Sequence, residues 1–317
     1  MKENAYFSPS EIYYRNLREL LADQSRKAEL RISELAAIAS EAAELSLAMN
    51  AEGLLPYEII AAFSDTDVLD TEIPADTADH SVKYVRNLSS FVSASDKAEF
   101  SRIYLSECAS RGLVIRAEDF FPNERSAQTM TYVKNSLSDE AYDVFSQDFE
   151  DPRVYYSESI KEAAVAVADG RIGYCILPFE EKGGSRISSI SDVIYKYQLK
   201  ISGITPVFGF EGNADVKYAL VAQSVTVPDM ADDDDGYAEL LVKNDEGSAL
   251  RDLMVAAGTL DLPIYKVCAV SLSDRANAEN YYSVILKTAG AGFEALLVYL
   301  SMFCPECDIV GLYKNLE

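Results

Sequence analysis

The chain has 317 residues, about twice the length of a typical domain, so we expect two or three domains. Hydrophobic residues make up 49% and charged residues 25%, which is typical of a globular protein with a real core and excludes disorder throughout. The formal net charge of −24 repels the phosphates of nucleic acids and anionic lipid surfaces, so we expect neither nucleic acid nor membrane as a partner.

The first residues and the cysteines indicate the compartment. Met1 to Ser10 has no basic segment followed by an apolar core, and no later apolar run approaches the roughly 18 residues that span a bilayer. Five cysteines are an odd number in a long chain, which argues against a disulfide framework and predicts a cytoplasmic protein with reduced thiols. Cys304 and Cys307 have CxxC spacing, but without a second pair, and with His80 as the only histidine, we expect no metal site and no cofactor.

Residues 1–125 are predicted to be mainly helical, and the sequence leaves their role open. Apolar residues recur at helical spacing from Ser10 to Asn50, which predicts one long amphipathic helix. Further helices are expected over Tyr57–Phe63 and Ser95–Arg111. A short strand is expected at Leu113–Ile115.

Residues 129–225 are expected to form an α/β lobe. Short strand-like runs alternate with helices of about ten residues, which is typical of right-handed βαβ crossovers and a largely parallel sheet. The expected strands are Thr129–Val133, Val154–Tyr156, Ile172–Leu177 (ended by Pro178), Ile204–Phe210 and Tyr218–Gln223. The expected helices are Ser138–Phe149, with Ser138 as its cap, Ser159–Asp169 and Ile187–Tyr197.

Residues 236–317 are expected to form a further unit, after an acidic linker. The order of its elements is βαββαβ, the ferredoxin-like arrangement. The expected strands are Tyr237–Val242, Ile264–Ser271, Tyr281–Thr288 and Ile309–Tyr313, and the expected helices are Ser248–Thr259 and Phe293–Cys304.

The α/β segment resembles prephenate dehydratase. The most specific match is Ala163 to Lys182, which is similar to that family's apolar helix followed by a strand ending in Leu-Pro-Ile-Glu-Asn-Ser. Tyr132 to Ala141 is similar to the family's opening strand, turn and helix, without the glycines of the turn. The resemblance implies a fold class of α/β and α+β: an N-terminal helical region, a single periplasmic-binding-like α/β lobe and a C-terminal ferredoxin-like unit.

The sequence departs from the prephenate dehydratase family at the motifs that carry the family's catalysis. The family's Asn-Ser pair is Glu181-Lys182 here, and its Thr-Arg-Phe signature falls on Val216-Lys217-Tyr218. The family threonine assists the leaving hydroxide, whereas Val216 has no proton to transfer. About five residues stand where the family's second lobe would be, although the residues before Gln128 offer another covering surface. We therefore expect degenerate catalysis at most.

The C-terminal segment resembles an ACT domain over its full length. Gly247, Ser248, Ala249 and Leu250 stand where that family has Gly-Ala-Leu at the start of its first helix. Free backbone N–H groups there can hold the carboxylate of an amino acid, which implies a ligand site at these four residues. ACT sheets pair across a two-fold axis, so the resemblance implies a homodimer, with apolar contact from Leu296, Leu297, Leu300 and Phe303.

Four charged residues of the α/β lobe are site candidates. Lys134, Arg186 and Lys217 lie at strand ends, where α/β sheets bind ligands, and either gather around a carboxylate or are solvated surface residues. Glu180 and Lys217 are the candidates for catalysis. Glu180 is equally suited to accept N–H groups of the adjacent Gly183-Gly184 turn.

Three functions remain open from the sequence. The resemblance favours a catalytically degenerate prephenate dehydratase-like protein of aromatic amino-acid metabolism, which binds or senses an aromatic amino acid or related acid through its ACT domain. The second is an active prephenate dehydratase, alone or joined to a chorismate mutase, that makes phenylpyruvate for phenylalanine biosynthesis. The third is an oligomeric interaction protein without a small ligand.

Overall fold

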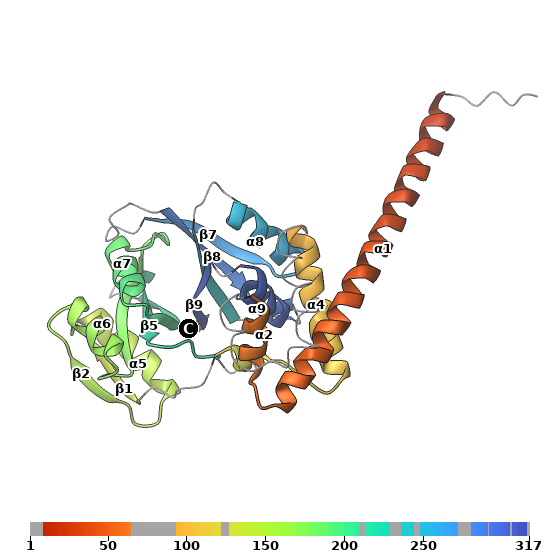
Figure 1. Ribbon diagram of the computed structural model, residues 1–317. Coiled ribbons are helices and arrows are strands. Elements are labelled where there is room, and N and C mark those ends of the chain that lie inside the picture. Colours follow the sequence, from red (N-terminus) through yellow and green to blue (C-terminus); the bar gives the residue numbers. More distant parts are fainter. Residues whose placement is uncertain are drawn as a thin grey trace, which may run out of the picture.

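The protein is a mixed α/β structure built on one large sheet. The computed structural model describes residues 9–64, 93–121, 127–208, 214–228, 236–243, 248–271, 280–290, 292–304 and 306–315. Within these ranges nine strands form a single sheet in the order β2-β1-β3-β5-β4-β9-β6-β8-β7. Helices of the α/β and C-terminal parts pack on this sheet, and the N-terminal helices pack in turn on the helices of the C-terminal part (Figure 1).

The first five strands in this order belong to residues 129–222, which we call the α/β half. Its elements are β1 (Thr129–Tyr132), α5 (Ser136–Phe145), η3 (Ser146–Asp148), β2 (Arg153–Tyr156), α6 (Ile160–Ala168), β3 (Tyr174–Glu181), α7 (Ser188–Lys196), β4 (Lys200–Phe208) and β5 (Ala214–Ala222). β1 is parallel to β2 and β3, but β5 is antiparallel to both β3 and β4. Four of these five strands, including β4, therefore run in the same direction, as predicted for a largely parallel sheet. β5 alone runs the other way, because it pairs antiparallel with β4, the strand that precedes it in the chain.

Three local predictions, two in this half and one before it, are wrong. β3 does not end at Pro178 but continues to Glu181, with a register shift between Pro178 and Glu180 that accommodates a residue without an N–H group. Asn135, not Ser138, caps α5, because its side chain accepts hydrogen bonds from the backbone N–H groups of Leu137 and Ser138. Residues 113–116 form no strand.

The next four strands form a C-terminal unit, residues 236–315. Its elements are β6 (Gly236–Lys243), α8 (Ser248–Thr259), β7 (Ile264–Ser271), β8 (Asn280–Lys287), α9 (Gly292–Phe303) and β9 (Cys307–Asn315). Its strands pair antiparallel in the order β9-β6-β8-β7. This confirms the predicted ferredoxin-like βαββαβ arrangement. That the unit is an ACT domain stays a prediction.

A close approach of two backbones joins the halves of the sheet. β4 runs parallel to β9, with Ile201 opposite Gly311. A β-carbon at Gly311 would lie 2.4 Å from the carbonyl oxygen of Ile201, so only glycine fits there without a shift of the backbone. The division into three domains stays a prediction, but the two C-terminal parts share one sheet.

The N-terminal helices are α1 (Pro9–Ala51), α2 (Pro56–Ser64) and α4 (Ala94–Ser110), followed by η2 (Ala117–Phe120). Ser93 caps α4 in a capping box with Asp96. The second half of α1 packs against α2 and α4 in a core that includes Leu35, Phe100 and Tyr104. The first half projects from the body (Figure 1), and every side chain from Leu20 to Glu34 is exposed. No helix in the described part of the chain is both long and apolar enough to cross a membrane.

These helices cover α8 and α9, which changes two expectations. Three leucines of α9 are buried in a core that includes Ala98 of α4: Leu296, Leu297 and Leu300. The prediction that they supply a free dimer surface is therefore wrong. Among the described helices, α1, α2 and α4 do not cover the strand ends of the α/β half, the place where the sequence offered them as a substitute for the missing lobe. They lie instead on the helical side of the C-terminal unit (Figure 1).

Candidate functional site

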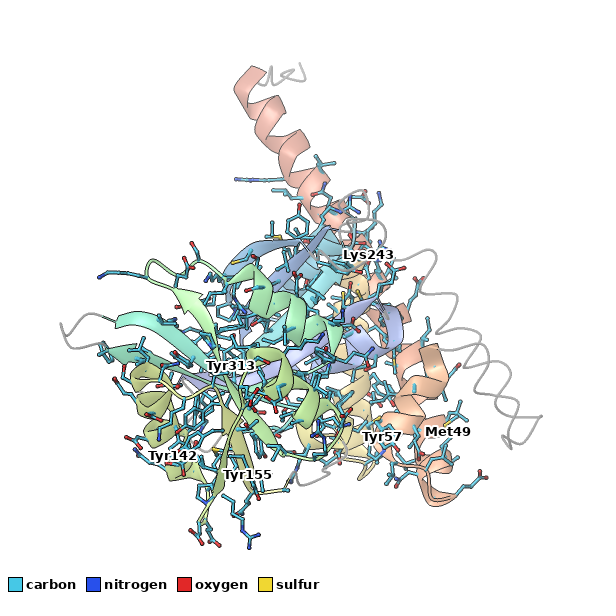
Figure 2. All side chains as sticks on the ribbon, turned by 90° about the vertical axis from the view of Figure 1, so that its left-hand side faces the viewer. Met49, Tyr57, Tyr142, Tyr155, Lys243 and Tyr313 are labelled. Atoms are coloured by element: carbon cyan, nitrogen blue, oxygen red, sulfur yellow. The ribbon has the colours of Figure 1, made fainter. Side chains whose placement is uncertain are left out.

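A cavity of about 350 Å³ lies where the α/β half meets the C-terminal unit, and we call it the Glu180 cavity. Its volume lies in the range of sites for small molecules. The α/β half contributes Glu180, Gly184, Arg186, Ile204 and Lys217, and the C-terminal unit contributes Tyr237, Tyr265, Lys266, Ile285 and Tyr313. Figure 2 shows Tyr313 near the centre of the molecule, among the strands.

Three cations surround the carboxylate of Glu180, whose side chain is only 7% exposed. Lys266 Nζ donates a hydrogen bond of 2.7 Å to Glu180 Oε1. Arg186 Nε lies 3.2 Å from the same oxygen, and Lys217 Nζ lies 3.6 Å from Glu180 Oε2. The side chain of Glu180 thus lies at the centre of a charge cluster.

A glycine turn brings Arg186 back to Glu180. Gly183 and Gly184 both have positive φ, at 97° and 81°, a conformation that favours glycine. The backbone then forms an antiparallel bridge between Glu180 and Arg186. Lys266 Nζ also donates a hydrogen bond of 2.8 Å to the carbonyl oxygen of Gly184, which ties the C-terminal unit to this turn.

A second carboxylate, Glu239 of β6, is fully buried beneath the cluster. Arg186 Nη2 donates to its Oε2 over 2.8 Å, and Ser283 Oγ donates to its Oε1 over 2.7 Å. Tyr313 OH donates to Oε2 over 3.3 Å. Burial is the largest single effect and acts to lower the pKa of Arg186. The charge and the hydrogen bond of Glu239, together with Tyr313 and Tyr195, outweigh it, so the pKa of Arg186 lies above its usual value. Arg186 therefore stays charged and links the two carboxylates.

Aromatic and aliphatic side chains form the other wall of the Glu180 cavity. The ring centroids of Tyr237 and Tyr265 are 5.1 Å apart at 64°, and those of Tyr237 and Tyr313 are 6.0 Å apart at 21°. Ile204 and Ile285 are buried beside them, whereas Tyr265 is 53% exposed. The cavity thus pairs a cationic wall with an apolar, largely aromatic one.

The structure brings some of the predicted site residues together and separates others. Glu180, Arg186 and Lys217 converge on the Glu180 cavity. Lys134 does not line it, and its Nζ lies 4.5 Å from the ring centroid of Tyr156. Gly247 lies outside the described residues. Ser248, Ala249 and Leu250 begin α8, which contributes no residue to the Glu180 cavity.

Sequence reasoning missed the half of the site that comes from the C-terminal unit. Glu239 had a usable signal, because it is the lone carboxylate of β6 and stands between apolar residues, Ala238 and Leu240. Lys266 falls by position on the first residue of the Glu-Ser-Arg-Pro motif of the ACT family, and this departure from the resemblance is its only signal. Nothing local to Tyr237, Tyr265 or Tyr313 indicates a site, because the pairing of β4 with β9 brings them to the α/β half.

The described wall of the Glu180 cavity carries cationic groups that are suited to binding an anion. No serine, threonine, cysteine or histidine is among the residues that line it. Lys217 and Val216 are neighbours on β5, and Val216 packs with Met130 and Tyr132 in a different cluster from the one that holds Ile204. Over the described residues there is also no group of three or more His, Cys, Asp or Glu placed to hold a metal ion.

Comparison with known proteins gives structural likenesses only. No protein-family model matches the chain, and no curated protein matches it. Prephenate dehydratase from Streptococcus mutans is 13% identical, with a TM-score of 0.48 over 60% of this chain and 100% of that one. Prephenate dehydratase from Arthrobacter aurescens in complex with L-Phe is 10% identical, with a TM-score of 0.43 over 59% and 90%. A protein described as a novel type of quorum-quenching acylase is 17% identical, with a TM-score of 0.44 over 59% and 95%. At these TM-scores, none of the three assigns a residue or an activity to this chain.

Proposed function

We propose that this protein binds a small aromatic acid or amino acid in the Glu180 cavity and carries out at most trace catalysis. The observation that supports this most is the meeting of Arg186, Lys217 and Lys266 at one cavity in a chain of net charge −24. A local excess of cations attracts an anion that the rest of the surface repels.

The chemistry of the two walls suits the two ends of such a ligand. Lys266 Nζ uses two of its three N–H donors, on Glu180 and Gly184. Within the described part of the chain, the one partner of Lys217 Nζ is Glu180, at an ion-pair distance of 3.6 Å. Both ammonium groups therefore retain donors for a carboxylate. The ring of the ligand would lie against Tyr237 and the buried side chain of Ile285, where aromatic contact adds to burial.

This proposal modifies the site implied by the ACT resemblance. The C-terminal unit would take part through Lys266 and its tyrosines, rather than through the Gly247 turn alone. Binding of this kind fits a sensor in aromatic amino-acid metabolism better than a dehydratase, because Val216 offers no transferable proton. An active dehydratase and a ligand-free interaction protein are the alternatives that the experiment below separates.

A thermal-shift screen of the full chain tests the proposal. The panel is phenylalanine, tyrosine, tryptophan, phenylpyruvate, 4-hydroxyphenylpyruvate, prephenate and chorismate, because a ligand of the native state raises the melting temperature. We expect at least one shift, abolished in Lys266→Met and retained in the matched control Lys134→Met. No shift from any compound would favour the interaction protein, and a shift retained in Lys266→Met would place the site elsewhere, most plausibly at the start of α8.

A further inference from the structure

We infer that the Glu180 cavity selects an aromatic acid with one negative charge and no ammonium group. This inference rests on the proposed function, since it names which class of aromatic acid the same cavity takes. It separates a keto acid or plain carboxylic acid from an amino acid, and from an acid with two carboxylates.

The charge balance of the cluster carries the inference. Among the described side chains, the charged groups that line the cavity are Glu180, Arg186, Lys217 and Lys266. Glu239 joins them beneath the floor through Arg186. Three cations and two carboxylates leave one net positive charge, which a ligand with a single carboxylate neutralises.

Burial of the cluster raises the free-energy cost of any charge imbalance. Glu180 and Arg186 are each less than a tenth exposed in their side chains, and Glu239 is fully buried. An aromatic ring placed against Tyr237 and Ile285 displaces water from the cavity and lowers the local dielectric constant further. Any charge left without a counter-charge is then costly, because its hydration is lost.

The other charge classes each leave an imbalance. An amino acid brings an ammonium group next to Lys217 and Lys266, while the nearest carboxylate, Glu180, already faces three cations. A dicarboxylate leaves one surplus negative charge beside Glu180 and Glu239. Among the described side chains, Lys217 and Lys266 retain N–H donors beyond their present partners, and Arg186 Nε has no hydrogen-bond partner. The limit to one carboxylate therefore comes from the charge balance and not from the number of donors.

A matched ligand series tests the inference on the wild-type chain by isothermal titration calorimetry. The series is 3-phenylpropanoate, L-phenylalanine, 2-phenylethylamine and phenylsuccinate, which share a phenyl ring and differ in charge. We expect 3-phenylpropanoate to bind roughly ten-fold to a hundred-fold tighter than the other three, the size of one charge-assisted hydrogen bond or one unbalanced charge. Equal or tighter binding of L-phenylalanine or phenylsuccinate would overturn the inference and leave the proposed function standing. Absence of binding by all four, together with a negative thermal-shift screen, would overturn the proposed function itself.

One substitution adds a second, independent readout. Lys217→Met removes one cation from a side chain that is 37% exposed, so the fold should tolerate it. We expect the affinity for 3-phenylpropanoate to fall about ten-fold or more, while binding of the uncharged 3-phenylpropanamide stays unchanged. Lys134→Met, outside the cavity, should change neither affinity. An equal loss for acid and amide in Lys217→Met would contradict the role assigned to this charge.

Discussion

Replacing Arg186 with methionine tests how the cluster holds the two halves together. The change removes the cation that lies 3.2 Å from Glu180 and 2.8 Å from Glu239, and it also removes the guanidinium that stacks 3.7 Å from the ring centroid of Phe179. Glu239 would remain fully buried with hydrogen bonds but no counter-charge. Leaving a buried charge unpaired costs about 3–5 kcal/mol, and methionine keeps much of the aliphatic volume, so we expect a loss of that order in the free energy of unfolding.

Urea denaturation followed by circular dichroism measures this loss, since the chain has no tryptophan to serve as a fluorescent probe. The matched control is Arg171→Met, because Arg171 is 61% exposed and its ion pair with Asp169 spans 3.4 Å. We expect that control to cost less than about 1 kcal/mol. Adding Glu239→Gln to Arg186→Met removes the orphaned charge and should recover part of the stability. An Arg186→Met protein within about 1 kcal/mol of wild type, or a double variant no more stable than the single one, would refute this reasoning.

Four further outcomes are expected. Gly311→Ala should lower the free energy of unfolding by about 1–3 kcal/mol, because its β-carbon would meet the β4 backbone, whereas Gly258→Ala, with open space around it, should be neutral or stabilising in the same urea titration. Ser93→Ala should cost about 1 kcal/mol by removing the cap of α4, and an unchanged unfolding curve would contradict this. Purified protein should convert prephenate at neutral pH no faster than a boiled control, and steady turnover abolished by Glu180→Gln would move the dehydratase to first place. Sedimentation of the full chain should give twice 34.9 kDa, since β7 is an edge strand with Val267 exposed, and a monomer at micromolar concentration would contradict a dimer.

The local elements of this fold could largely be predicted from the sequence, because their signals are local. Ser248–Thr259 and Ile264–Ser271 match α8 and β7 at both ends. The pairing of β4 with β9 could not be predicted in this way, because Ile201 and Gly311 are far apart in the chain and their contact depends on a glycine in a strand. The same limit applies to the antiparallel place of β5 between β3 and β4.

The same distinction between local signals and long-range contacts applies to the residues of the site. Glu180 and Arg186 stand six positions apart in the chain, on either side of a glycine turn, so the sequence could indicate that they act together. Lys266 reaches Glu180 only because the C-terminal unit docks beside the α/β half, which no short-range pattern encodes. Lys134, like Arg186, is a basic residue at the end of a strand, but the cavity does not form at that end of β1.

A crystal structure of the full chain with bound 3-phenylpropanoate would test the Glu180 cavity most directly. We expect the carboxylate within hydrogen-bond distance, about 3 Å, of Lys217 Nζ and Lys266 Nζ, with the phenyl ring against Tyr237. Density for the ligand at the start of α8, beside Ser248, with the Glu180 cavity unchanged, would contradict the assignment of the site.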